Sequence, residues 1–76
     1  MTTTTLGLEA AFALAIAETD RLGWLGPMLW PAPSGDEWRA AAHAHLGSAV
    51  EESYAHGPTP ARALETLARV LAELPR

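Results

Sequence analysis

The chain has 76 residues, enough for one small domain, and it has no cysteine, which excludes disulfides, thiolate metal sites and thiol catalysis. The formal net charge is −4 at pH 7, and the five basic residues are arginines scattered singly along the chain, so nucleic acid is not an expected partner. The longest apolar run, residues 10–17, is about half of the roughly 20 residues that a membrane helix needs, so we expect no membrane segment and a cytoplasmic location. Lysine, asparagine and glutamine are also missing, a composition typical of proteins from GC-rich bacterial or phage genomes.

The first helix is predicted over residues 6–22, after a flexible tail over residues 1–5, and it ends at Gly23. One stripe at three- and four-residue spacing is expected to face the core, and its members are Leu8, Phe12, Ala15, Ile16, Thr19 and Leu22. The charged residues near the end of this helix are expected to be solvated, and they are Glu18, Asp20 and Arg21. Because alanine and leucine surround the stripe, we expect the helix to be covered on more than one side.

Residues 24–33 (WLGPMLWPAP) carry two of the three tryptophans and three of the six prolines. The prolines exclude a continuous helix, since each lacks an N–H and restricts the residue before it. The segment is therefore expected to be an irregular connection packed over the end of the helices. Its large apolar side chains have two interpretations, either as bulk that fills an alanine-rich core or as a surface that binds a partner.

A second helix is predicted over residues 34–56. Residues 34–37 read SGDE, a capping-box pattern in which Ser34 accepts the backbone N–H of Glu37 at a helix start. One face is expected to carry Trp38, Ala42, Leu46, Ala49, Val50 and Ser53. Gly47 then falls inside the helix, where glycine costs about 1 kcal/mol relative to alanine.

The third helix is predicted to begin at Thr59-Pro60, because threonine caps helices and proline suits the first helical position. Leucines at alternating three- and four-residue spacing form its apolar seam, and they are Leu64, Leu67, Leu71 and Leu74. Glu65 and Arg69 are spaced to form an ion pair along the helix. The short connection before Thr59 predicts that the second and third helices are antiparallel neighbours.

These elements predict an all-α fold, a three-helix bundle with a proline- and tryptophan-rich connection between the first and second helices, in a single domain over residues 6–76. The apolar surface is large for so short a chain. We therefore expect a homo-oligomer, most simply a twofold dimer in which the first or third helix pairs with its copy.

Catalytic and metal sites are not evident in the sequence. The three histidines, His43, His45 and His56, do not have the spacing of zinc ligands on a helix. Glu52 and His56 share a face at four-residue spacing and His45 joins Glu52 only loosely, so a site there would need further ligands from across an interface. Adjacent carboxylates diverge on a helix and form no acid–base dyad, and no nucleophile elbow or phosphate loop is present. We expect no enzymatic activity, no cofactor and no bound metal.

The sequence favours a non-enzymatic protein–protein interaction module, an accessory subunit or small inhibitor that binds a protein partner of unknown identity. The predicted partner-binding anchors are Trp24, Met28, Leu29 and Trp30, with the acidic residues Glu51 and Glu52 at the rim. Two alternatives stay open. The short turn over residues 57–59 suits a helix-turn-helix-like DNA-linked regulator or antitoxin, and the histidines suit a small metal- or ligand-binding helical protein.

Overall fold

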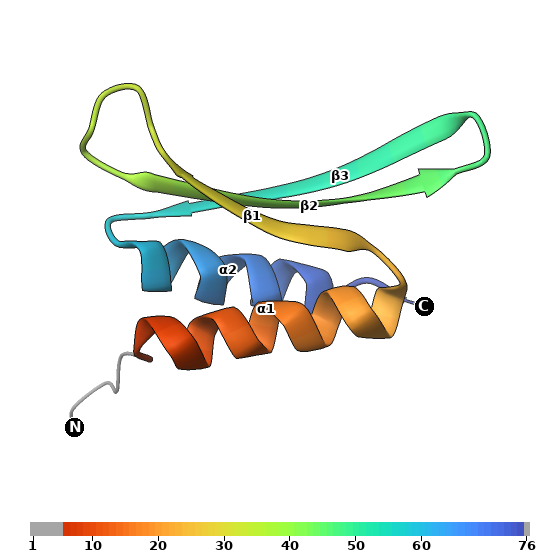
Figure 1. The fold of residues 1–76 in the computed structure, drawn as a ribbon, viewed down its shortest axis with the longest axis horizontal. Coiled ribbons are helices and arrows are strands. Elements are labelled where there is room, and N and C mark those ends of the chain that lie inside the picture. The colour runs from red at the N-terminus through yellow and green to blue at the C-terminus, as the bar shows by residue number, and fades with distance from the viewer. Residues whose placement is uncertain (1–5, 76) are drawn as a thin grey trace.

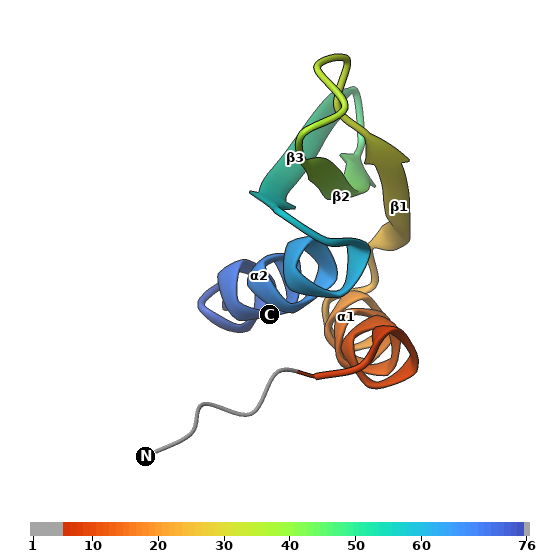
Figure 2. The same ribbon diagram turned by 90° about the vertical axis from the view of Figure 1, so that its left-hand side faces the viewer.

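The computed structural model describes residues 6–75, and its fold class is α+β, so the predicted all-α three-helix bundle is wrong. The elements in chain order are α1 (Leu8–Leu22), β1 (Leu25–Pro31), β2 (Trp38–Leu46), β3 (Ala49–Gly57) and α2 (Pro60–Ala72) (Figure 1). The strands form one antiparallel sheet in the order β1-β2-β3. Both helices cover the same face of this sheet and leave the other face open (Figure 2). The predicted flexible tail, residues 1–5, lies outside the described residues.

The largest correction concerns residues 34–56, which form strands β2 and β3 instead of a helix. Every second residue at the start of β2 faces the core, since Ala40 and Ala42 are fully buried while Arg39 between Trp38 and Ala40 is exposed. This is the two-residue period of a strand. Gly47 is not a helix-interior residue. It has φ +67° in the two-residue turn between β2 and β3, a position where this hairpin turn favours glycine.

The segment read as a capping box is the loop between β1 and β2. The Ser34 hydroxyl accepts the N–H of Asp36 at 3.4 Å, and the N–H of Ala32 donates to the carbonyl of Glu37 at 2.9 Å. A serine hydroxyl satisfies a backbone N–H in a tight turn as well as at a helix start, and this ambiguity produced the false helix start.

Residues 24–33 contain a strand, β1, and not the irregular connection that the sequence predicted. The prolines do exclude a helix there, but an edge strand tolerates them because one side of its backbone pairs with no neighbour. Pro31 lies opposite Trp38, and the pairing of β1 with β2 shifts between Leu25 and Met28, which is a β-bulge.

The junction between β3 and α2 follows the predicted start of the third helix. The Thr59 hydroxyl accepts the N–H of Arg62 at 3.2 Å, and Pro60 is the first helical residue. Gly57, the last residue of β3, lies so close to the helix that a Cβ there would be 2.8 Å from the backbone nitrogen of Ala63. Glycine is therefore required for the chain to turn directly from strand to helix.

The core is built around the leucines of α2, and their predicted inward orientation is confirmed. Leu64, Leu67 and Leu71 are fully buried, and they are the largest apolar side chains with no exposed surface in the described part of the chain. Small residues from α1, the sheet and α2 surround them, and these are Ala11, Ala15, Ala40, Ala42, Ala55, Ala63 and Ala68. Leu29, Trp24 and Trp38 pack against the margin of this cluster.

Helix α1 ends before Gly23 as predicted, but only Ala15, Thr19 and Leu22 of the predicted stripe face the core. Its buried residues are Ala11, Ala15 and Thr19, whereas Leu8, Phe12 and Ile16 of the predicted stripe are between 37% and 49% exposed. The small residues allow α1 to lie close to α2. Neither helix described here has the length and apolar character needed to cross a membrane.

Arg21 ties the two helices together, although the sequence suggested that it would be solvated. The helices run parallel, so both end on the same side of the molecule (Figure 1). Arg21 Nη2 donates to the carbonyls of Leu71 and Leu74, at 2.9 and 3.0 Å, and Nε pairs with Glu18 Oε1 at 2.7 Å. A guanidinium thereby satisfies carbonyls at the negative end of the α2 dipole.

The buried leucine seam predicts a large loss of stability when it is truncated. Leu67→Ala should lower the free energy of unfolding by about 2–5 kcal/mol, because it removes a fully buried side chain from a core too small to close the cavity. Leu14→Ala is the matched control, since Leu14 is 46% exposed, and it should change stability by less than about 1 kcal/mol. Urea unfolding followed by circular dichroism measures both, and equal losses would contradict this description of the core.

The Arg21 contacts predict a second, smaller loss. Arg21→Met should lower the free energy of unfolding by about 1.5–3 kcal/mol, since it leaves two carbonyls at the end of α2 without their charged donor. Arg21→Lys should recover part of this loss, because a lysine ammonium keeps the positive charge but lacks the planar set of N–H donors of the guanidinium. The same urea titration measures both variants. If Arg21→Met is as stable as the wild type, the hydrogen bonds from Arg21 to the end of α2 contribute nothing to stability.

Candidate functional site

The face of the sheet that the helices leave uncovered carries most of the large polar and aromatic side chains of the strands. We call it the open sheet face and define it by its members, which are Leu25, Met28, Trp30, Arg39, Ala41, His43, His45, Val50, Glu52, Tyr54 and His56. They share one face because side chains alternate along each strand and residues opposite one another in register point to the same side. Ala40, Ala42 and Ala55 mark the other face, since they pack in the core.

The register arranges these residues in rows across the three strands. Trp30, Arg39 and His56 form one row. Met28, Ala41 and Tyr54 form the next, and Ala41 is only 2% exposed although it faces away from the helices. The short Ala41 side chain thus lies between the longer side chains of Met28 and Tyr54.

A hollow of about 390 Å³ lies at the loop end of this face. Its lining residues are Trp30, Glu37, Arg39, Tyr54, Ala55 and His56. Two charge contacts order its polar wall. Glu37 Oε2 lies 3.0 Å from His56 Nδ1, and Glu37 Oε1 lies 4.0 Å from Arg39 Nη2. The aromatic rings therefore stand next to a carboxylate that is already partnered.

The residues predicted to bind a partner are divided between the two faces. Trp24 and Leu29 pack against the core. Met28 and Trp30 lie on the open sheet face, where Met28 is 45% exposed. Of the predicted acidic rim, Glu52 lies on the open sheet face opposite His43, whereas Glu51 lies opposite Ala44 and faces the other way. Both glutamates are exposed.

Sequence reasoning did not bring Arg39 together with Tyr54 and His56, because a helix over residues 34–56 separates Arg39 from the other two by roughly 22 Å or more along its axis. The signal that would have united them is the alternation of Arg39, His43 and His45 with buried alanines, followed by the Gly47-Ser48 turn. That pattern predicts a hairpin, and a hairpin brings Arg39 and His56 directly opposite each other.

The histidines are arranged differently from the prediction for a helix. On a strand, residues two apart share a face, and the rings of His43 and His45 meet edge to face with centroids 5.6 Å apart. Among residues 6–75, no group of three or more histidine, aspartate or glutamate side chains is close enough to hold a metal ion.

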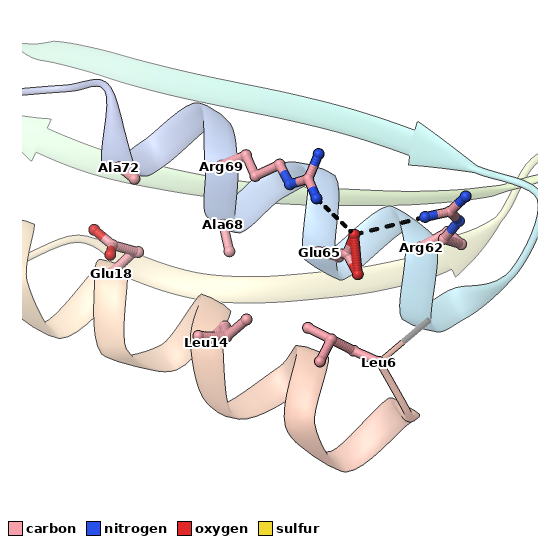
Figure 3. Close-up of a pocket in the computed structure, with 8 residues that line it drawn as sticks. All are labelled: Leu6, Leu14, Glu18, Arg62, Glu65, Ala68, Arg69 and Ala72. Carbon is pink, nitrogen blue, oxygen red and sulfur yellow. Dashed lines mark ion pairs between the residues drawn. The ribbon is translucent and has the colours of Figure 1, made fainter. Parts of the chain in front are cut away.

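A second hollow, of about 410 Å³, lies between α1 and α2 on the far side of the molecule from the open sheet face (Figure 3). Leu6 and Leu14 line its α1 side. On α2, the nearly buried carboxylate of Glu65 lies 3.3 Å from Arg69 and 3.6 Å from Arg62, so the predicted Glu65–Arg69 pair is confirmed (Figure 3). The negative charge of Glu65 is thus neutralised by the two arginines of α2 itself.

The two hollows offer different chemistry to a ligand. Neither is lined by serine, threonine or cysteine, and among their lining residues the one hydroxyl is the phenol of Tyr54. The hollow between the helices is a short apolar groove with paired charges. The open sheet face combines a broad surface with tryptophan, tyrosine, methionine and arginine, which are the residue types enriched at the centres of protein interfaces. Comparison of the chain with protein-family models, curated proteins and solved structures finds no significant match.

Proposed function

We propose that this protein is a non-enzymatic interaction module that binds a protein partner through the open sheet face. The observation that carries the proposal is the gathering of Met28, Trp30, Arg39 and Tyr54 on the one face that no helix covers. A three-stranded sheet with one solvated face ordinarily alternates apolar inward and polar outward residues. Here the outward positions hold residue types that supply most of the binding energy in protein interfaces.

Trp30 and Arg39 are the proposed centre of this surface. They lie directly opposite each other on neighbouring strands, and both line the hollow that Glu37 and His56 close on its polar side. An aromatic ring beside an ordered guanidinium gives a partner a flat apolar contact and a directional donor at once. Met28 extends the apolar surface by one row. Glu52, which lies opposite His43 on the same face, is the acidic residue proposed for the rim of this surface.

The fold removes the basis of the DNA-linked alternative. A helix-turn-helix requires two helices joined by the turn over residues 57–59, and this turn joins β3 to α2. Stacked bases on Trp30 and Tyr54 would be another use of an aromatic sheet face. However, Glu37 and Glu52 lie among these residues and the net charge is −4, which disfavours a phosphate backbone.

The proposal predicts which substitutions weaken partner binding. A tagged chain is used to recover partners from the source cell, the partner is identified by mass spectrometry, and its dissociation constant is measured with both proteins purified. Trp30→Ala and Met28→Ser should each raise that constant by roughly tenfold or more, since hot-spot truncations cost about 2 kcal/mol or more. Leu14→Ser is the matched control, because Leu14 is 46% exposed on α1 and Met28 is 45% exposed on β1, and it should bind as the wild type does.

Circular dichroism of each variant separates lost binding from lost structure, and Met28→Ser keeps the test valid if Trp30→Ala does not fold. Partner binding that is unaffected by Met28→Ser and lost in Leu14→Ser would transfer the function to the helical layer. Tight binding of single-stranded oligonucleotides that both sheet variants abolish, with no protein partner, would replace the proposal with nucleic-acid recognition.

A further inference from the structure

The two edges of the sheet differ in how far they are protected from another strand. The β1 edge contains Pro27, Pro31 and a β-bulge, which are devices that prevent edge-to-edge pairing. The β3 edge has neither a proline nor a register shift over its nine residues. Its protection is limited to two adjacent carboxylates, Glu51 and Glu52.

The backbone groups that β3 offers at this edge follow from one hydrogen bond elsewhere in the sheet. The N–H of Ala32 donates to the carbonyl of Glu37, so residue 37 and every second residue after it on β2 turn their backbone groups toward β1. The residues between them, including Ala40 and Ala42, turn toward β3. Their partners on β3, Ala55 and Ser53, therefore direct their backbone N–H and C=O groups toward β2, inside the sheet. The outward backbone groups of β3 belong to Val50, Glu52, Tyr54 and His56.

We propose that a second copy of this chain pairs with the first along β3, antiparallel, with Tyr54 opposite the partner's Tyr54 on the twofold axis. The inference goes beyond the proposed partner surface and does not depend on it. The pairing joins the two sheets into one of six strands. It keeps both helical layers on the same side, because residues of like orientation face each other across the axis.

Charge selects this register among the central ones. A register centred on Glu52 places two carboxylates directly opposite each other, which is destabilising. One centred on Ser53 places Glu52 opposite the partner's Tyr54 and leaves no nitrogen donor opposite the carboxylate. The register centred on Tyr54 places Glu52 opposite the imidazole of the partner's His56 on both sides of an aromatic pair, and aromatic pairs are a stabilising cross-strand combination.

The position of His56 suits this second carboxylate. Its Nδ1 already faces Glu37 at 3.0 Å, so Nε2 is the ring nitrogen that remains for a contact with the partner's Glu52. Beneath the strand, Val70 lies on the flank of α2 opposite to Ala68, which faces the groove with α1, and it is 38% exposed.

Sedimentation equilibrium over a roughly hundredfold range of chain concentration tests the proposal, because self-association follows mass action. The wild type should reach twice the chain mass of 8.1 kDa. Glu52→Pro should raise the dimer dissociation constant by roughly tenfold or more, since it removes an outward N–H that the twofold axis uses twice, while an edge strand tolerates the proline. Ser53→Pro is the control for strand orientation. It removes an N–H that pairs with β2, so it should disturb the fold itself.

The register has a test of its own, independent of whether Glu52→Pro folds. Glu52→Arg and His56→Glu should each dimerise at least about tenfold more weakly alone, because each replaces both Glu52–His56 pairs with unfavourable ones. Mixed in equal amounts, they should recover association, since the mixed dimer pairs an arginine with a glutamate on one side and His56 with Glu52 on the other. A wild-type chain that stays at 8.1 kDa throughout, or a dimer that is unchanged by all these substitutions, would overturn the proposal. A chain that stays monomeric, and whose β3 amides change only when an extended peptide is added, would show that the β3 edge pairs with a strand from another molecule and not with a second copy.

Discussion

The packing of three leucines against small residues is the interaction on which the rest of the structure depends. Leu64, Leu67 and Leu71 project from one side of α2 into a setting made almost entirely of alanine. Because alanine side chains are short, α1 and the sheet both lie close to the α2 backbone, and the leucines fill the space that is left. A chain of 76 residues cannot bury many large side chains, so the stability of the domain rests on a few.

Because the core has room for few large side chains, the other large apolar residues lie at the surface. The positions that face the leucines hold small residues, and the large apolar residues of the sheet are therefore on its margin or its open face, as Met28 and Trp30 are. The same holds for α1, where Ala11 and Ala15 are buried while Phe12 and Leu14 remain exposed. The surface is apolar because the core is small. The interpretation that the chain binds other macromolecules follows from this distribution more directly than from any motif.

The sequence predicted the two ends of the chain well and its middle poorly, for physical reasons. Helix α2 is predicted by Thr59, Pro60 and leucines at helical spacing. The capping residues and the core packing favour the same helix there. In β2 the residues Ala40, Ala42 and Ala44 favour a helix by intrinsic propensity, and burial against α2 overrides that preference. Alanine at every second position gives only a weak apolar alternation, so the strand period was hidden.

The candidate site was predicted to the same extent as the strands that build it. Met28 and Trp30 were recognised from their side chains alone, because large apolar residues in a proline-rich segment are conspicuous under any fold. Arg39 and Tyr54 needed the hairpin register, which brings residues fifteen apart in sequence into adjoining rows. Trp24 and Leu29 were assigned to the surface with Met28 and Trp30. Alternation along β1 sends Leu29 to the opposite side, and Trp24, just before the strand, packs against the core with it.

The distribution of charge gives the open sheet face a further property that bears on its partner. With neutral histidines, its members and Glu37 carry one arginine against two glutamates, so this face holds only a small part of the net charge of −4. The rest of the net negative charge comes mainly from α1 and the β1–β2 loop, and α1 lies in the helical layer on the other side of the sheet. A nearly neutral aromatic face on an acidic chain complements a partner that has an apolar patch and carries net positive charge. The net charge of −4 attracts a basic protein at long range and repels the phosphate backbone of a nucleic acid, and in the proposed function the contacts at the open sheet face would then decide which protein is held.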